Sequence, residues 1–178
     1  GPLVLIDRHT MPSKKLMAVE PKYVVMMSTA DVPDDPNIAV EGWEYMEYPG
    51  ERDLLAKGMA DIKRQYPHVK PMFHVAPSLY ATNRPGEQFP NSRIIDEHGR
   101  QKMYNGNKPE YYRRYFSKAY VAEGWRWYLF YPTLDNRFGE LMIEANEYMM
   151  TEMNAEGLFG DGLFSMYGGG YSYDRWDG

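Results

Sequence analysis

The sequence predicts an α/β fold in which strands and helices alternate around a parallel sheet. Apolar runs rich in β-branched or aromatic residues recur four times along the 178 residues, with amphipathic segments between them. The connections after the predicted strands are long, whereas those after the helices are short. Repeated strand–loop–helix units pack as parallel strands with helical crossovers. Long loops at the carboxyl ends of the strands are typical of (β/α) barrels of the TIM type.

The four predicted strands are expected to be adjacent and parallel. Each is a short apolar run that ends in a polar or glycine-rich loop, which is the pattern of a buried strand. They are Tyr23–Ala30, Met72–Ala76, Trp127–Tyr131 and Leu158–Gly160. A complete eight-stranded barrel needs about 250 residues, so four units predict an incomplete barrel, a single partial domain over residues 1–178.

Three helices are predicted between these strands. Glu51–Tyr66 carries apolar residues at helical spacing and is followed by a proline. A second helix begins at Pro109 and runs to Glu123, with Gly124 as its C-terminal stop. The clearest helix follows Asp135 or Asn136, either of which is a good N-cap. An inserted segment at about residues 78–108 contains a predicted hairpin with arms 93–96 and 100–104.

The composition excludes several classes of function. A balance of 20 basic against 25 acidic residues gives a net charge of −5, which opposes a nucleic-acid partner. No apolar run approaches the roughly 18 residues of a membrane span, so a soluble chain without a membrane partner is expected. Zero cysteines exclude a disulfide scaffold and a cysteine nucleophile. Neither phosphate-binding glycine motif occurs, and the four histidines lack metal-ligand spacing, so we expect no cofactor and no metal.

Two aspartates are the candidate catalytic residues. Asp161 follows an apolar strand between two glycines, where an acid projects from the carboxyl end of the sheet and a substrate can approach the backbone. The structural alternative is an aspartate that caps a turn. Asp135 also follows a predicted strand, and its alternative is the ordinary N-cap of the next helix.

The other candidates are substrate-binding residues. His74 lies at a strand end, where it is either a hydrogen-bond donor to a substrate hydroxyl or a buried core histidine. The chain is 15% aromatic, and many aromatic residues adjoin glycine, proline or acids in loops, as in platforms for sugar rings, although core packing also explains them. The binding candidates are His74, Tyr131, Trp43, Tyr171, Tyr173, Asp174, Trp176 and Asp177. The alternative for the two aspartates is that they are solvated turn residues. Tyr80 is expected to join these aromatic residues at one end of the sheet.

Three stretches resemble a TIM-barrel glycoside-hydrolase-like family, specifically the second half of its barrel. They are residues 130–136 (FYPTLDN), 157–161 (GLFGD) and 171–178 (YSYDRWDG), and the hairpin at 95–101 is also similar. In that family a strand ending in an acid is followed by an aromatic loop containing Trp-Asp-Gly. The resemblance covers about residues 20–178, with Gly162 standing where a second acid is expected.

The resemblance implies a glycoside hydrolase that acts on a poly- or oligosaccharide. Cleavage would use carboxylate acid/base chemistry, for which two carboxyl groups must flank one glycosidic bond. A non-catalytic carbohydrate-binding barrel and a different barrel enzyme, such as a lyase or isomerase of a small acid, are the alternatives. The start lacks an initiator Met and a signal peptide, which predicts a processed or excised piece completed by further segments of the same polypeptide. The compartment is not fixed by the sequence, and a secreted or periplasmic one is slightly favoured.

Overall fold

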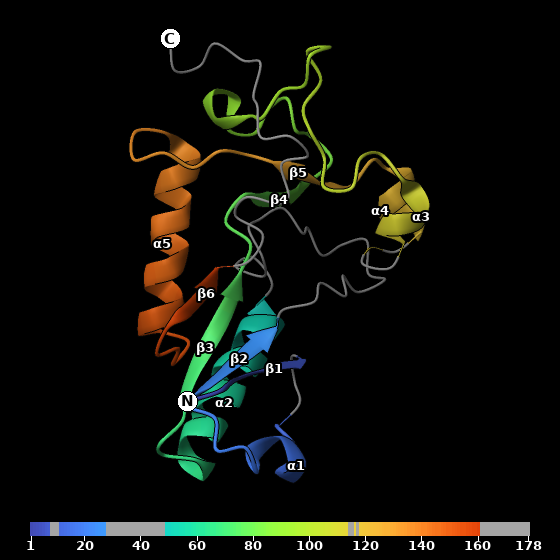
Figure 1. Ribbon diagram of the computed structural model, residues 1–178. Coiled ribbons are helices and arrows are strands. Elements are labelled where there is room, and N and C mark those ends of the chain that lie inside the picture. Colours follow the sequence, from blue (N-terminus) through green and yellow to red (C-terminus); the bar gives the residue numbers. More distant parts are fainter. Residues whose placement is uncertain (8–10, 28–48, 114–115, 117, 161–178) are drawn as a thin grey trace.

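The structure, a computed structural model, describes residues 1–7, 11–27, 49–113, 116 and 118–160. Within these residues the chain forms a parallel sheet of four strands and an antiparallel sheet of two. Figure 1 shows the antiparallel sheet beyond the carboxyl ends of the parallel strands. The predicted α/β class and parallel sheet are therefore confirmed.

The parallel sheet has the strand order β1-β2-β3-β6. Its strands are β1 (Leu3–Asp7), β2 (Tyr23–Met27), β3 (Lys70–Val75) and β6 (Leu158–Gly160). Each neighbouring pair is parallel, with Val24 opposite Pro71 and Val75 opposite Gly160. Three of these strands confirm the sequence prediction, whereas β1 was not predicted.

The predicted strand Trp127–Tyr131 does not belong to the parallel sheet, and that prediction is wrong. The segment forms β5 (Arg126–Leu129), which pairs antiparallel with β4 (Leu79–Thr82). Its side chains alternate between two environments. Tyr128 and Phe130 pack into the main core, whereas Trp127 packs against the separate clusters around Tyr112 and Leu79. High β propensity marks a half-buried strand but does not specify its partner.

The predicted hairpin is present inside the inserted segment. Ile95 and Gln101 form an antiparallel bridge, and the Asp96 N–H donates to the Arg100 carbonyl at 2.8 Å. Gly99 has φ of +76°, the left-handed conformation that its turn position requires. The second arm also pairs with β5, because the Tyr104 N–H donates to the Trp127 carbonyl at 2.9 Å. The insertion and β5 therefore form one antiparallel unit.

The helices of the described residues are α1 (Lys14–Met17), α2 (Pro49–Gln65), α3 (Pro109–Tyr112), α4 (Lys118–Ala122) and α5 (Arg137–Thr151), with a 3-10 turn η1 at Pro90–Ser92. Two of the three predicted helices are present as α2 and α5, the third is divided, and α1 was not predicted. The structure has two short helices, α3 and α4, where the sequence predicts one. Tyr112, Phe116 and Tyr120 from this region all pack into one aromatic cluster, so burial of their rings stabilises the segment. None of the helices within the described ranges is long and apolar enough to cross a bilayer.

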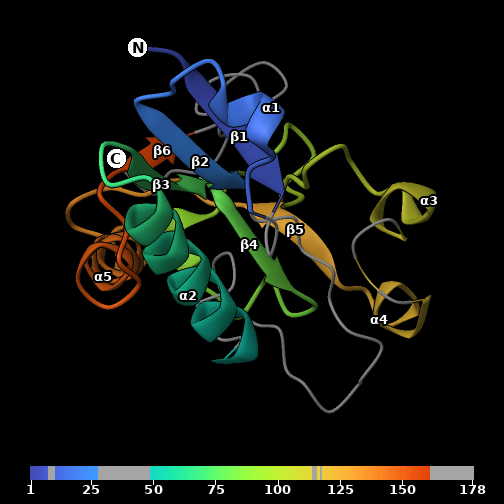
Figure 2. The same cartoon turned by 90° about the horizontal axis from the view of Figure 1, so that it is seen from below.

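Two long helices cover one face of the parallel sheet. Leu55 and Met59 of α2, and Phe138 and Met149 of α5, belong to one core together with the sheet residue Phe73. α2 and α5 lie side by side (Figure 2), and the Lys63 ammonium pairs with Glu156 after α5 at 2.6 Å. On the first strand, Leu3 and Leu5 point away from that core and are 40% and 48% exposed. The strands of the parallel sheet therefore follow one another in chain order, and both long helices pack on the same face of that sheet.

Candidate functional site

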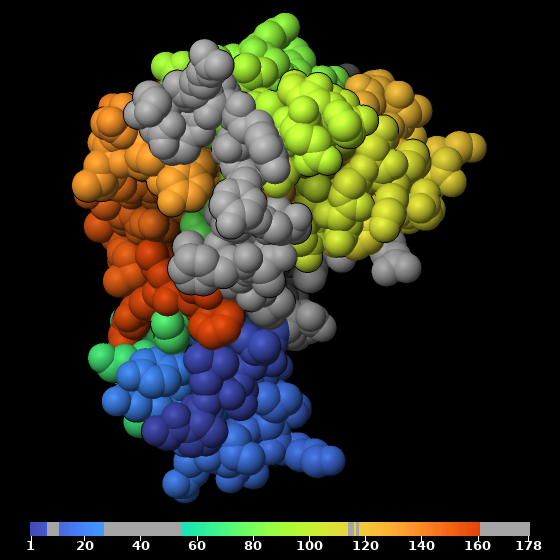
Figure 3. Space-filling view, turned by 45° about the horizontal axis from the view of Figure 1, so that its top comes forward, coloured from blue at the N-terminus to red at the C-terminus, as the bar shows by residue number. Residues whose placement is uncertain are grey.

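Most of the candidate site residues lie outside the part of the chain that the structure describes. These are Asp161, Trp43, Tyr171, Tyr173, Asp174, Trp176 and Asp177. His74, Tyr131 and Asp135 are described. His74 belongs to β3, and the other two lie in the connection between β5 and α5. Figure 3 brings the top of the view in Figure 1 forward. It shows the inserted segment in green to yellow-green and the beginning of α5 in orange.

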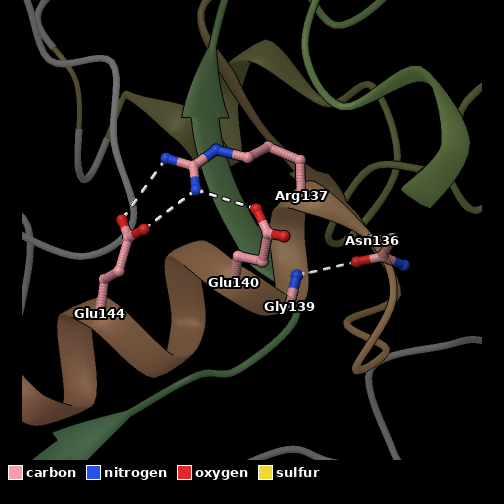
Figure 4. A network of polar contacts seen from close by, with 5 residues as sticks. All are labelled: Asn136, Arg137, Gly139, Glu140 and Glu144. Atoms are coloured by element: carbon pink, nitrogen blue, oxygen red, sulfur yellow. Dashed lines mark hydrogen bonds and ion pairs between the residues drawn. The ribbon is translucent and has the colours of Figure 1, made fainter.

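The connection between β5 and α5 (residues 131–135, the β5–α5 loop) is fixed by a dense set of hydrogen bonds. Asn136 is the N-cap of α5, and its Oδ1 accepts from the Gly139 N–H at 2.8 Å (Figure 4). The same Oδ1 accepts from the Thr133 N–H at 3.3 Å, and the Asn136 Nδ2 donates to the Tyr131 carbonyl at 2.9 Å. One buried amide side chain therefore joins the loop to the first turn of the helix.

Asp135 is exposed and does not cap the helix. The sequence allowed either Asp135 or Asn136 as the cap, and the structure assigns that role to Asn136. The Asp135 Oδ1 instead accepts from the Thr133 hydroxyl at 2.5 Å. Helix capping therefore does not explain the aspartate at this position, and its carboxylate is accessible to a ligand.

Tyr131 lies at the beginning of the same loop with its side chain half-exposed. Its backbone N–H donates to the Ser92 carbonyl at 2.6 Å, which ties the loop to the inserted segment. Tyr131 is 46% exposed and Leu134 is 90% exposed. The loop thus combines a fixed backbone with an accessible ring, an accessible carboxylate and an apolar tip.

The first turns of α5, next to the loop, carry three charged side chains that pair with one another. Arg137 donates to Glu140 at 3.1 Å and to Glu144 at 3.0 Å (Figure 4). The hydrogen bonds that Arg137 donates to Glu144, and next to Glu140, raise the pKa of its guanidinium above the usual value. Because these groups are exposed, their pairing adds little to stability and mainly orders the side chains.

His74 is buried in the parallel sheet. It is 6% exposed, and its ring stacks on that of Phe159 in the neighbouring strand with centroids 6.2 Å apart. The two residues are register partners, so their side chains stand on the same face of the sheet. This placement agrees with the core alternative for His74, while its role as a donor to substrate stays a prediction.

The aromatic residues of the described part are mainly core residues. Tyr80, in β4, is 5% exposed and packs edge-on against Phe89, Phe130 and Phe138, so its ring is a core ring. Its predicted convergence with Trp43, Tyr171 and Trp176 involves residues outside the described part of the chain and stays a prediction. A second cluster gathers Tyr112, Phe116, Tyr120, Trp125 and Trp127 beneath the antiparallel sheet. Ring burial and edge-to-face packing explain this part of the aromatic excess.

A buried arginine within the second cluster was not found by sequence reasoning. The Arg126 Nε donates to the Asn107 Oδ1 at 2.9 Å, and its Nη1 donates to the Val121 and Trp125 carbonyls. Its guanidinium lies 5.1 Å from the centroid of the Tyr112 ring. Burial raises the pKa of the Tyr112 and Tyr128 hydroxyls, and the nearby arginine partly opposes this. The only sign of the buried Arg126 in the sequence is its place between two aromatic residues where a predicted strand begins.

The described residues contain no group of three histidine, aspartate or glutamate side chains that could hold a metal ion. Of the candidate site residues that the structure describes, Tyr131 and Asp135 bring an accessible ring and an accessible carboxylate together in the β5–α5 loop. Comparison of the chain with models of protein families, with curated proteins and with solved structures gives no match.

Proposed function

We propose that the chain is part of a (β/α)-barrel glycoside hydrolase that cleaves a poly- or oligosaccharide. The observation that supports this most is the winding of the parallel sheet. The four strands lie in chain order, and α2 and α5 pack against the same face. A doubly wound sheet reverses its strand order and carries helices on both faces, whereas a barrel adds each unit beside the preceding one. Further segments of the same polypeptide would complete the barrel.

The arrangement at the carboxyl ends of the strands also supports a site there. The inserted antiparallel unit follows β3 and the β5–α5 loop precedes α5, so both belong to strand-to-helix connections. In barrels these connections build the active site. Asp161 follows the last residue of β6 directly in the sequence.

The proposed chemistry needs one carboxyl group as an acid and a second as a nucleophile or base. Asp161 is proposed as the nucleophile or base. Asp135 is proposed as the second carboxyl group, since it is exposed and Asn136 performs the capping. Asp174 and Asp177 are the other sequence candidates for that role, and the ring of Tyr131 would stack on a sugar.

The proposal is tested by measuring the release of reducing ends from a panel of polysaccharides by the full-length protein. Asp161→Asn and Asp135→Asn should each lower turnover by about 100- to 10,000-fold, because a lost acid, base or nucleophile costs that much. Their melting temperatures should stay close to that of the wild type, since an isosteric amide leaves no cavity.

Asp61→Asn is the matched control. This aspartate pairs with Lys57 and Arg64 on α2, and its removal changes the charge equally. It should keep full turnover. If the wild type binds an oligosaccharide without cleaving it, the non-catalytic carbohydrate-binding barrel replaces the hydrolase. If it neither binds nor cleaves any glycan of the panel, the proposal is wrong.

A further inference from the structure

The backbone of the β5–α5 loop occupies the space that a side chain at residue 139 would need. A Cβ atom built on Gly139 would lie 1.7 Å from the carbonyl oxygen of Thr133 and 2.7 Å from its carbonyl carbon. Atoms that are not bonded to each other cannot approach so closely. Only glycine at this position lets the loop rest on the first turn of α5.

The conformation of Gly139 does not itself require glycine. The residue is part of the regular helix α5, and its φ does not lie in the left-handed region that favours glycine. A glycine inside a helix is destabilising relative to alanine. Glycine is therefore needed here because the Thr133 backbone leaves no room for a side chain. A larger residue would push the β5–α5 loop away from the helix.

Asn136 reinforces the same contact through hydrogen bonds. Its amide group accepts from the Gly139 and Thr133 N–H groups and donates to the Tyr131 carbonyl. These three bonds fix both ends of a loop whose Tyr131, Leu134 and Asp135 side chains are nevertheless exposed. A backbone that is held this firmly fixes the point from which each side chain leaves the loop before any ligand arrives, which lowers the entropy lost on binding.

We infer that Gly139 and Asn136 are positioning residues of the proposed glycan-cleaving site. They hold the β5–α5 loop against α5, so that the Tyr131 ring and the Asp135 carboxylate meet the sugar in a fixed geometry. This inference rests on the proposed function, and it adds which residues set the geometry of that site.

Gly139→Ala tests the inference, with Gly58→Ala as the matched control. Both glycines lie inside long helices, but a Cβ at Gly58 would meet only the end of the Met26 side chain, at 2.8 Å. The alanine at 139 must move the Thr133 backbone by on the order of an ångström, and such a misplacement costs about 100-fold in rate. We expect kcat/KM for glycan hydrolysis to fall by about that factor in Gly139→Ala, mainly through kcat. Gly58→Ala should stay within about twofold of the wild type.

Two variants of Asn136 provide the readout that a merely structural role would not move. Asn136→Asp keeps an oxygen that can accept from Gly139 and Thr133, whereas Asn136→Ala keeps none of the three bonds. Asn136→Asp loses the donor to the Tyr131 carbonyl, so its turnover should be intermediate. Turnover should be lost in Asn136→Ala, after correction of both values for the folded fraction by circular dichroism. In an Asp135→Asn background, Gly139→Ala should cost little further activity, because residues that act as one unit are not additive.

The outcomes separate this inference from the proposed function. If the wild type cleaves glycan and Gly139→Ala matches Gly58→Ala in turnover, the positioning role is wrong and the hydrolase stands. A full additive loss in the Asp135→Asn background would also overturn it. If the wild type shows no hydrolysis and no glycan binding, both the proposed function and the positioning role are wrong.

Discussion

Tyr112 is a fully buried phenol whose hydroxyl donates to the backbone carbonyl of Tyr104. Tyr112→Phe removes this donor and leaves the carbonyl without it, so the free energy of unfolding should fall by about 1–3 kcal/mol at pH 7. Chemical unfolding in urea, followed by circular dichroism, measures this change. An unchanged midpoint would show that the hydrogen bond contributes nothing.

The same residue predicts a loss of stability in alkali. Burial raises the pKa of Tyr112 in the folded state, whereas an unfolded tyrosine ionises near pH 10. Its contribution is therefore complete below about pH 10 and is lost as the pH rises above that value. The free energy of unfolding of the wild type should decline as the pH rises above about 10, and that of Tyr112→Phe should decline less steeply over the same range.

Asp96 predicts the opposite dependence in acid. The backbone N–H of Arg100, and next that of His98, lower the pKa of its carboxyl group, with further help from the Arg100 guanidinium at 3.0 Å. A lowered pKa stabilises the fold above the unfolded value near 4, and this contribution disappears as the pH falls below it. Asp96→Asn should lower the melting temperature at pH 7 and have no effect near pH 2. Glu97→Gln, at an exposed neighbour, should change neither value.

At the scale of the element, α5 shows how the helical spacing divides a segment between core and solvent. Met149 is 1% exposed and the adjacent Met150 is 43% exposed. Met149→Ala should cost about 2–5 kcal/mol of the free energy of unfolding, because it removes a packed side chain and leaves a cavity. Met150→Ala should stay within about 0.5 kcal/mol. Equal effects in thermal unfolding would mean that the helix faces are assigned wrongly.

At the scale of the whole molecule, the order of the sheet predicts a gradient of protection. β2 is paired on both sides, and its Val24 and Val25 are completely buried. β1 is the terminal strand of this sheet within the described residues. In hydrogen exchange followed by mass spectrometry, amides of β2 should therefore exchange at least about tenfold more slowly than those of β1. Equally slow exchange would show that another strand pairs with β1.

The sequence determined the elements whose cause is local. The spacing of Leu55 and Met59 predicted α2, the run around Met149 predicted α5, and the turn at Gly99 predicted the hairpin. The runs that became β2, β3 and β6 were also predicted, because buried parallel strands are continuously apolar. The candidates Tyr131 and Asp135 were found in the same way, since Tyr131 ends a predicted apolar strand and Asp135 lies in the loop after it.

Only the tertiary structure decided which strand pairs with which, and which aromatic side chains are buried. β propensity is the same whether a strand joins a parallel or an antiparallel sheet, so the sequence could not show that β5 pairs with β4. Tyr80 is adjacent to loop residues along the chain, yet it is buried by Phe130 and Phe138, which lie about 50 residues or more further on. The choice of Asn136 over Asp135 as the cap, and the contact of Gly139 with Thr133, likewise depend on how the loop folds back onto the helix. Such contacts between distant or returning segments are set by packing, which no local pattern of residues encodes.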